Sequence, residues 1–328
     1  MSAATTIVLL SVDEAPMLAY SLPAAVLQED ADVLVVDNAC TDNTPALARE
    51  HGARHLRIAH RVSYAVAMNM AIAEAEAPAV LLLNADCFLE ADFLARARPR
   101  LDEDGVGSVA PKLLRTRGPL DAGPPLGIDA AGMVVDRRRK NGLVGHGRPA
   151  SAHAAAADCF GADGAAALYR RDVLARCALA PREGDGYSGL PEVFDEDMAL
   201  WASDADLAWR ARLLGWRCVY EPAARARHIR TYSPSTRDEV DPAHRRLQFR
   251  NRYLMWFKNE TRAGLLRDLP RIAAYEVAAL GHVLLRERHL LEGYREVREA
   301  LPRARERRAE VQSRRAVRRV PFGLEPPP

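Results

Sequence analysis

Leu81-Leu82-Leu83-Asn84-Ala85-Asp86 reads as an apolar strand that ends in a carboxylate, and it is the most informative stretch of the chain. Short apolar runs alternate with helical patterns through the first part of the chain, and the expected strands are Ile7–Val12, Val33–Val36, a short one at His55–Ile58, and Val80–Leu83. The resulting β-α-β-α-β-α-β order predicts an α/β fold with a doubly wound, mostly parallel sheet flanked by helices. In such open sheets, ligands bind outside the carboxyl ends of the strands, so Asp86 is expected to face a binding crevice.

A second group of acids lies far downstream, in Ser203-Asp204-Ala205-Asp206-Leu207, and His228 follows it. A carboxylate just past a buried strand can hold a hard cation against a phosphate. A second, separate carboxylate is what acid–base chemistry on that ligand requires. Together the two groups of acids predict an enzyme.

Local signals mark where the predicted helices begin. Pro16 can occupy the first helical position without losing a hydrogen bond, and Thr44-Pro45 starts a helix that Gly52 closes. Ser63 can cap a helix that runs to about Glu76. These helices supply the crossovers between parallel strands.

The second half of the chain is less regular. From about 115 to 157 the pattern breaks into Gly, Pro and a basic run at 137–140, which predicts either a mobile surface excursion or a β-hairpin insertion near the site. Regular elements then resume, and the expected ones are a strand at Gly164–Tyr169, a helix at Asp172–Cys177, an acidic loop at Pro181–Asp197, a helix from Ser203 to about Leu214 and a strand at Arg217–Glu221. We predict a catalytic domain over residues 1–235 and a helical, basic C-terminal appendage over 236–328.

Composition narrows the class of protein. A chain of 328 residues can bury a full core, and a net charge of +2 is too small to indicate nucleic-acid binding. Five widely spaced cysteines are typical of reduced thiols in a cytosolic protein. The N-terminal apolar run stops at Asp13-Glu14, and no segment offers the roughly 18 uninterrupted apolar residues of a membrane span. We expect a cytoplasmic protein that is soluble or peripheral on the inner face of the cytoplasmic membrane.

The first strand–helix connection argues against a dinucleotide-binding oxidoreductase. The connection Ser11-Val12-Asp13-Glu14-Ala15-Pro16 has two acids and no glycine. A pyrophosphate needs glycines there for close backbone approach, and it needs a positive helix N-terminus. Two acids would repel it.

An ordered series of short motifs runs from about residue 5 to 260. The motifs are Ser11–Leu18, Asp37-Asn38-Ala39-Cys40-Thr41-Asp42, Asn69, Leu82–Asp86, Gly164–Arg171, Phe194-Asp195-Glu196, Asp204-Ala205-Asp206-Leu207-Ala208-Trp209-Arg210 with Gly215-Trp216, His228, and Arg250-Asn251-Arg252. In this series the chain resembles a family 2 glycosyltransferase of the GT-A fold. Among these enzymes it is similar to the bacterial rhamnosyltransferase-like group that acts on cell-surface polysaccharides.

The resemblance implies a nucleotide-diphosphate-sugar donor and a divalent metal, Mn²⁺ or Mg²⁺. Asp86 would be the metal ligand at the family's Asp-x-Asp position, whose first acid is Asn84 here, and His228 would complete the metal sphere. Since such ions bind ligand atoms at about 2.0–2.3 Å, the side-chain tips of Asp86 and His228 are expected within roughly 5 Å of each other. Asp204 would be the catalytic base, although the family more often has Glu at the position of Ser203.

The resemblance also implies residues that contact the two substrates. The nucleotide-sugar-binding candidates are Ser11, Asp13, Glu14, Asp37, Asn69, Asn84 and Arg250, with Asp37 accepting hydrogen bonds from the nucleobase. The acceptor candidates are Trp201 and Asp206.

Each assignment has a structural alternative. Ser203 and Asp206 match a helix capping box, Asp37 can stabilise its own turn, Asp86 can cap a following helix, His228 can be a surface histidine, Trp201 can be a core residue, and Arg250 can pair with a nearby acid.

The C-terminal segment combines apolar and basic patterns. Apolar residues recur at helical spacing between Leu265 and Leu284, and Arg267, Arg271, Arg286 and Arg288 lie on other faces of that helix. This pattern is typical of an amphipathic interfacial helix, and a helix packed on the catalytic domain or on a dimer partner is the alternative. Residues 286–319 hold twelve Arg and six Glu, a surplus of six positive charges that favours a membrane or an acidic partner.

We therefore predict an inverting, metal-dependent glycosyltransferase that moves a sugar from a nucleotide-diphosphate sugar to a hydroxyl of a glycan or lipid-linked acceptor. dTDP-rhamnose is one candidate donor. A catalytically silent GT-A-like binding or assembly subunit is the alternative, because Asn84 and Ser203 stand where acids are usual. A sugar-nucleotide pyrophosphorylase would need a Gly-rich, basic loop after its first strand, and the sequence lacks one.

Overall fold

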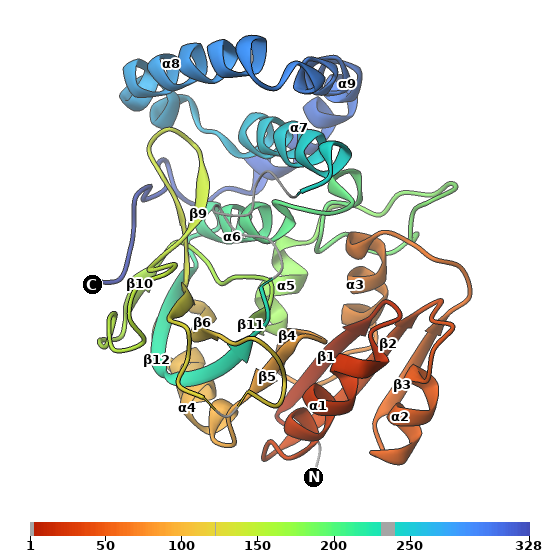
Figure 1. Cartoon of the computed structure of the whole chain (residues 1–328). Coiled ribbons are helices and arrows are strands. Elements are labelled where there is room, and N and C mark those ends of the chain that lie inside the picture. Colours follow the sequence, from red (N-terminus) through yellow and green to blue (C-terminus); the bar gives the residue numbers. More distant parts are fainter. Residues whose placement is uncertain (1–2, 122, 231–239) are drawn as a thin grey trace.

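The computed structural model describes residues 3–121, 123–230 and 240–328. Within them, one mixed sheet holds the strands in the order β10-β12-β6-β11-β4-β1-β2-β3, with β5 paired to β12 and β7 paired to β6. Helices lie on both faces of this sheet, and the C-terminal helices α7, α8 and α9 form a further layer beyond α6 (Figure 1).

The elements in chain order are β1 (Thr5–Ser11), α1 (Ala15–Val26), β2 (Ala31–Asn38), α2 (Thr44–Glu50), β3 (Arg54–Ile58), α3 (Tyr64–Ala73), β4 (Ala79–Asn84), β5 (Cys87–Leu89), α4 (Phe93–Ala97), β6 (Val106–Arg115), β7 (Ile128–Ala131), β8 (Met133–Val135), β9 (Asn141–Leu143), β10 (Ala157–Cys159), β11 (Ala166–Arg170), α5 (Arg171–Cys177), α6 (Ser203–Leu213), β12 (Arg217–His228), α7 (Pro242–Asn259), α8 (Arg262–Leu285) and α9 (Leu291–Arg314).

The predicted parallel core is confirmed. β1 pairs in parallel with β2 and β4, and β2 pairs in parallel with β3. Along β1, Ile7 and Leu9 face the core under α1 and α4, whereas Val8 and Leu10 face the core under α3 and α5. Because both faces of the strand are covered, the run is apolar throughout, as is usual for a doubly wound sheet.

The helix starts follow the local signals. Ser63 caps α3, and its hydroxyl accepts a hydrogen bond from the Val66 N–H at 3.3 Å. α1 has its proline in the first turn, as expected for Pro16, and Gly52 after α2 has φ +66°. The side chain before α2, Asn43, makes no capping hydrogen bond.

The irregular region between β6 and β10 is an insertion of β structure. β8 and β9 form an antiparallel hairpin, and β7 pairs with β6, which confirms the hairpin interpretation. Residues 128–135 are all buried, so this part of the region is not a surface excursion. The insertion therefore contributes side chains to the interior.

Strand β12 is longer than the predicted Arg217–Glu221. After an irregularity between Glu221 and Arg225, the strand continues to His228 beside β6. Its last residues also pair with β5, where His228 lies opposite Cys87. This extension carries His228 to the end of β4, next to Asp86.

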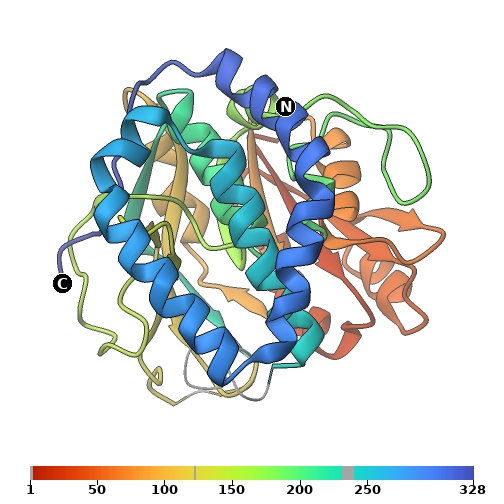
Figure 2. The ribbon, with the colours of Figure 1, turned by 90° about the horizontal axis from the view of Figure 1, so that it is seen from above.

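The segment after residue 240 is helical, as predicted, and α7 packs between α6 and α9 (Figure 2). The predicted domain boundary at 235/236 lies in 231–239, outside the described residues. The cysteines form no disulfide within the described ranges, although the Sγ atoms of Cys159 and Cys218 lie 3.6 Å apart across β10 and β12.

Candidate active site

Asp86 and His228 meet at the carboxyl end of the sheet. Asp86 lies in the turn between β4 and β5, and His228 is the last residue of β12. His228 Nε2 is 3.4 Å from Asp86 Oδ1, so the predicted proximity is confirmed. His228 is only 5 % exposed, which excludes the surface-histidine alternative. Metal binding by this pair stays a prediction.

A third residue, Asp129 of β7, orients the histidine. Asp129 is fully buried, and its Oδ2 lies 2.8 Å from His228 Nδ1. A carboxylate on one ring nitrogen fixes the rotation of an imidazole and directs the other nitrogen, here Nε2, toward its ligand. The sequence analysis missed Asp129, because it lies in the irregular insertion. The only available signal was a lone acid in an otherwise apolar run.

Burial and neighbouring charges shift the pKa values of the groups around Asp86 and His228. Burial lowers the pKa of His228, but hydrogen bonds to Asp129 and Asp86 outweigh it and raise that pKa to about 9. Burial alone would raise the pKa of Asp129, yet hydrogen bonds from His146, His228 and Arg230 hold it far below its usual range. Burial and then the charge of Asp86 raise the pKa of Glu14 to about 7. Glu14 and Asp86 thus share a region of negative potential.

The network continues from Asp129 toward Asp204. Arg230 donates to Asp129 Oδ1 at 2.7 Å and to Asp163 Oδ2 at 3.1 Å. Asp204, in the first turn of α6, accepts from the backbone N–H groups of Ala205 and Gly164 at 2.7 and 3.4 Å. Burial and then the charge of Asp163 raise the pKa of Asp204 to about 6. A carboxyl with a pKa near neutrality suits general-base work.

The predicted nucleotide residues of the first two strands lie side by side, since Ser11 and Asp37 are register partners. Ser11 Oγ is 2.9 Å from Thr44 Oγ1. Asp37 is fully buried and accepts from Arg57 at 2.6 Å, from the Cys40 N–H at 2.7 Å and from His55 at 3.1 Å. Asp37 therefore does stabilise its turn, and its contact with a nucleobase stays a prediction.

Asp13, Cys40 and Asp42 also cluster, with ligand atoms within 4.8 Å of one another. Their oxygens are already engaged, because Asp13 pairs with Arg61 and Asp42 accepts from the Ala15 N–H at 2.7 Å. Burial raises the pKa of the Cys40 thiol, which disfavours the thiolate that a metal needs. A cation at this cluster would have to displace these partners.

The two predicted asparagines lie in different surroundings. Asn69 is buried, and its amide exchanges hydrogen bonds of 2.8 Å with the backbone of Phe194 and donates to Glu196 at 2.9 Å. Asn69 thereby fixes the segment that leads toward α6. Asn84 is half-buried at the end of β4, two residues before Asp86. Sugar or ribose contacts by these side chains stay predictions.

The loop before Asp204 is strained and is held by Asn251. Ala199, Trp201 and Ala202 have φ values of 33°, 69° and 58°, a region that non-glycine residues rarely adopt. The buried Asn251 Nδ2 donates to the carbonyls of Met198, Leu200 and Trp201 at 2.8, 2.7 and 3.2 Å, respectively. Asn251 lies in the motif Arg250-Asn251-Arg252, in which Arg250 is the predicted site residue.

Arg250 and the two acceptor candidates, Trp201 and Asp206, lie in three different surroundings. Arg250 donates to the Asp197 carbonyl at 2.9 Å and lines an open hollow of about 690 Å³ between α7 and α9. Trp201 is half-buried in the strained loop. Asp206 is fully buried and accepts from Arg210, Lys258 and Asn259 at 2.9, 3.0 and 2.7 Å.

Asp206 therefore joins α6 to α7 in the interior, and this structure gives it no surface for an acceptor. The capping-box alternative is wrong as well. The residue before α6 is Ala202, which has no side-chain cap, and Ser203 is already helical.

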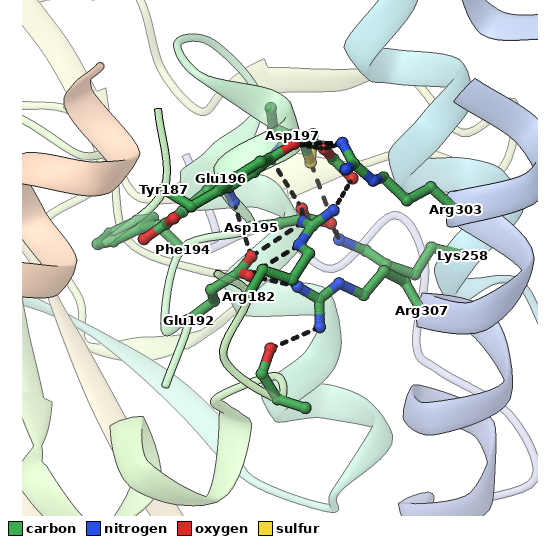
Figure 3. Close-up of polar contacts among 12 residues, drawn as sticks. Arg182, Tyr187, Glu192, Phe194, Asp195, Glu196, Asp197, Lys258, Arg303 and Arg307 are labelled. Atoms are coloured by element: carbon green, nitrogen blue, oxygen red, sulfur yellow. Dashed lines mark hydrogen bonds and ion pairs between the residues drawn. The ribbon is translucent and has the colours of Figure 1, made fainter. Parts of the chain in front are cut away.

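The acidic loop ahead of α6 is tied to α7 and α9 by ion pairs (Figure 3). Arg182 pairs with Glu192 at 3.0 Å and with Asp197 at 2.7 Å. Lys258 of α7 pairs with Asp195, and Arg307 of α9 pairs with Glu192. Helices α7 and α9 thus hold the acidic loop that leads into α6.

Replacing Asn251 by Ala removes three hydrogen bonds to the strained loop. We expect the free energy of unfolding to fall by about 1–3 kcal/mol, because buried carbonyls lose their partner. Urea denaturation measures this change. Asn43→Ala is the matched control, since Asn43 is exposed and makes no capping bond. An Asn251→Ala protein as stable as the control would show that these three hydrogen bonds do not stabilise the fold.

Comparison with known proteins shows the family of the chain and solved structures with a similar fold. The sequence profile of glycosyl transferase family 2 matches residues 6–177, more than half of the chain. No curated protein matches significantly. The fold is similar to that of the mannosyltransferase PcManGT from Pyrobaculum calidifontis in complex with GDP-Man and Mn²⁺. That structure has a TM-score of 0.51 and 18% identity over 95% of this chain and 85% of that one.

Two further solved structures share the fold. One is S. aureus TarS 1-349 in complex with UDP-GlcNAc, with a TM-score of 0.57 and 14% identity over 94% of this chain and 89% of that one. The other is GalNAc-T7 with UDP, GalNAc and Mn²⁺, with a TM-score of 0.56 and 12% identity over 78% of this chain and 48% of that one. These likenesses confirm the predicted GT-A fold. The family profile establishes that the chain belongs to glycosyl transferase family 2.

Proposed function

We propose that this glycosyltransferase inverts the transferred sugar, depends on a divalent metal and uses Asp204 as its base. The observation that carries the proposal is the contact between Asp86 and His228, continued through Asp129 and Arg230 to the surroundings of Asp204. One network thus joins a candidate cation site to a candidate base. The Mn²⁺ and nucleotide-sugar complexes of proteins with the same fold support this proposal.

The donor atoms fit a divalent ion. Asp86 offers a carboxylate that is 24% exposed, and His228 presents Nε2 toward it while Asp129 holds Nδ1. Imidazole beside carboxylate suits Mn²⁺ at least as well as Mg²⁺. When bound, such an ion neutralises the departing nucleoside diphosphate.

Asp204 would accept the proton of the acceptor hydroxyl. The acceptor oxygen forms a bond to the anomeric carbon as the bond from that carbon to the diphosphate oxygen breaks, and the hydroxyl proton goes to Asp204. A single displacement of this kind inverts the anomeric carbon. Asp163 is an acidic neighbour of Asp204, although Ser203 replaces the acid that precedes the base in related enzymes.

The subgroup and substrates are the finer part of the proposal. The motif series favours a rhamnosyltransferase-like enzyme of cell-surface polysaccharide synthesis, so dTDP-rhamnose is the first donor to test. A glycan or lipid-linked acceptor would meet the donor in the cytoplasm. A catalytically silent subunit is the competing function, because Asn84 and Ser203 stand where related enzymes have acids.

Asp204→Asn tests the base. We expect turnover to fall about 10²–10⁴-fold with donor binding nearly unchanged, because the amide cannot accept a proton. In the wild type, turnover should fall as the pH drops through about 6, where Asp204 becomes protonated. This acid limb should be absent from the residual activity of the variant. Turnover of Asp204→Asn within about threefold of wild type would refute the assignment. A wild type that transfers no sugar from any donor would favour the silent subunit.

Asp129→Asn tests how His228 is oriented. We expect Mn²⁺ affinity to fall about 10–100-fold, the usual effect of losing the carboxylate behind a ligating histidine. Calorimetry or the Mn²⁺ paramagnetic resonance signal measures this without turnover. Asp158→Asn is the control, because Asp158 is a half-exposed carboxylate paired with Arg217 at 2.7 Å. Equal Mn²⁺ affinity in the two variants, with thermal unfolding showing both folded, would exclude a role for Asp129.

A further inference from the structure

Helix α8 presents a large apolar face to solvent. It lies with α9 at the edge of the molecule beyond α7, far from the N-terminus (Figure 1). Six of the twelve large hydrophobic side chains that are exposed among the described residues belong to this one helix. They are Leu266, Leu269, Val277, Leu280, Leu284 and Leu285, with exposed fractions from 43% to 81%. Apolar patches of this kind mark interaction sites on soluble domains.

The two acids of α8 and the acid just after its C-terminal end all pair with arginines on the inner side of the helix. Asp268 is 1% exposed and pairs with Arg137 and Arg139 of the β8–β9 hairpin. Glu276 pairs with Arg252 of α7 at 2.6 Å. Glu287, just after the helix, is buried and pairs with Arg245 of α7 at 2.8 Å. These ion pairs fasten the inner side of α8 to the rest of the molecule.

Several arginines in α8 or just after it are exposed. Arg267 and Arg271 are exposed in the helix, and Arg286 and Arg288 are exposed at its C-terminal end. The exposed part of α8 and its C-terminal end therefore combines leucine and valine with arginine, and none of Asp268, Glu276 and Glu287 is exposed there.

From this segregation we propose that the outward face of α8 docks on an anionic phospholipid bilayer. Apolar side chains enter the interface between headgroups and acyl chains, while the arginines contact lipid phosphates. α8 would lie along the surface, since no helix in the described ranges is long and apolar enough to cross a membrane. This inference goes beyond the proposed reaction and does not depend on it.

A second copy of the chain is a poorer occupant for this face. In a two-fold dimer the same patch faces itself, so the arginines of one α8 would meet those of the other. No exposed acid of α8 would offset that repulsion. Charge complementarity therefore favours an acidic surface over a second α8.

The test is vesicle flotation of the full chain. We expect binding to vesicles that contain phosphatidylglycerol and little binding to pure phosphatidylcholine. Leu266→Ser with Val277→Ser should lower vesicle affinity about tenfold or more, because each side chain contributes buried apolar area. Arg271→Gln with Arg286→Gln should lower it as well and should reduce its dependence on salt.

Matched controls come from other exposed sites. Leu27→Ser, at a leucine that is 76% exposed after α1, should leave vesicle binding unchanged. Arg49→Gln with Arg148→Gln should also leave it unchanged. Thermal unfolding shows that each variant is folded, and sedimentation gives its oligomeric state.

Three results would overturn the proposal. The first is equal binding to neutral and anionic vesicles, and the second is no vesicle binding by the wild type. The third is a wild-type dimer that the α8 substitutions dissociate, which would assign the face to a second copy.

Discussion

The candidate site depends on one buried imidazole held between two carboxylates. His228 contacts Asp129 through Nδ1 and Asp86 through Nε2, and it is almost fully buried. Each partner comes from a different part of the chain: β7 in the insertion, the turn after β4, and the end of β12. A charge buried in such a group is costly unless every member is paired, so removing one partner typically costs about 3–5 kcal/mol. The group therefore fixes the relative positions of three segments as well as the geometry of the site.

Buried polar groups paired across distant segments also hold the C-terminal helices in place. Asp206 of α6 is surrounded by Lys258 and Asn259 of α7, and Arg307 of α9 reaches Glu192 in the acidic loop. Asn251 of α7 holds the strained residues that lead into α6. Helices α7 and α9 thus hold the segment that leads into α6, the helix whose first turn carries Asp204.

The sequence predicted the parts of the fold whose signals are local. β1, β2, β4 and the helices between them follow from apolar runs, Pro16 and Ser63, because these three strands are largely buried on both faces and each helix start has its signal within a few residues. β3 is a short edge strand with two exposed residues. The extension of β12 to His228 could not be predicted in this way, because an irregularity after Glu221 interrupts the strand pattern. Asp129 and Asn251 were missed for a related reason: their importance arises from contacts with partners 99 and about 50 residues away. The resemblance implied an acceptor contact for Asp206, yet long-range pairs with α7 bury it.

Binding of nucleotide-sugar donors with and without Mn²⁺ tests whether Asp86 and His228 hold a divalent ion at the donor site. A calorimetric screen of dTDP-, UDP- and GDP-sugars would measure the affinity of each donor for the wild type and for Asp86→Ala. We expect at least one donor to bind, Mn²⁺ to strengthen its binding, and Asp86→Ala to abolish the effect of Mn²⁺. Donor binding that is independent of Mn²⁺, or an effect of Mn²⁺ that survives in Asp86→Ala, would contradict a cation site at Asp86.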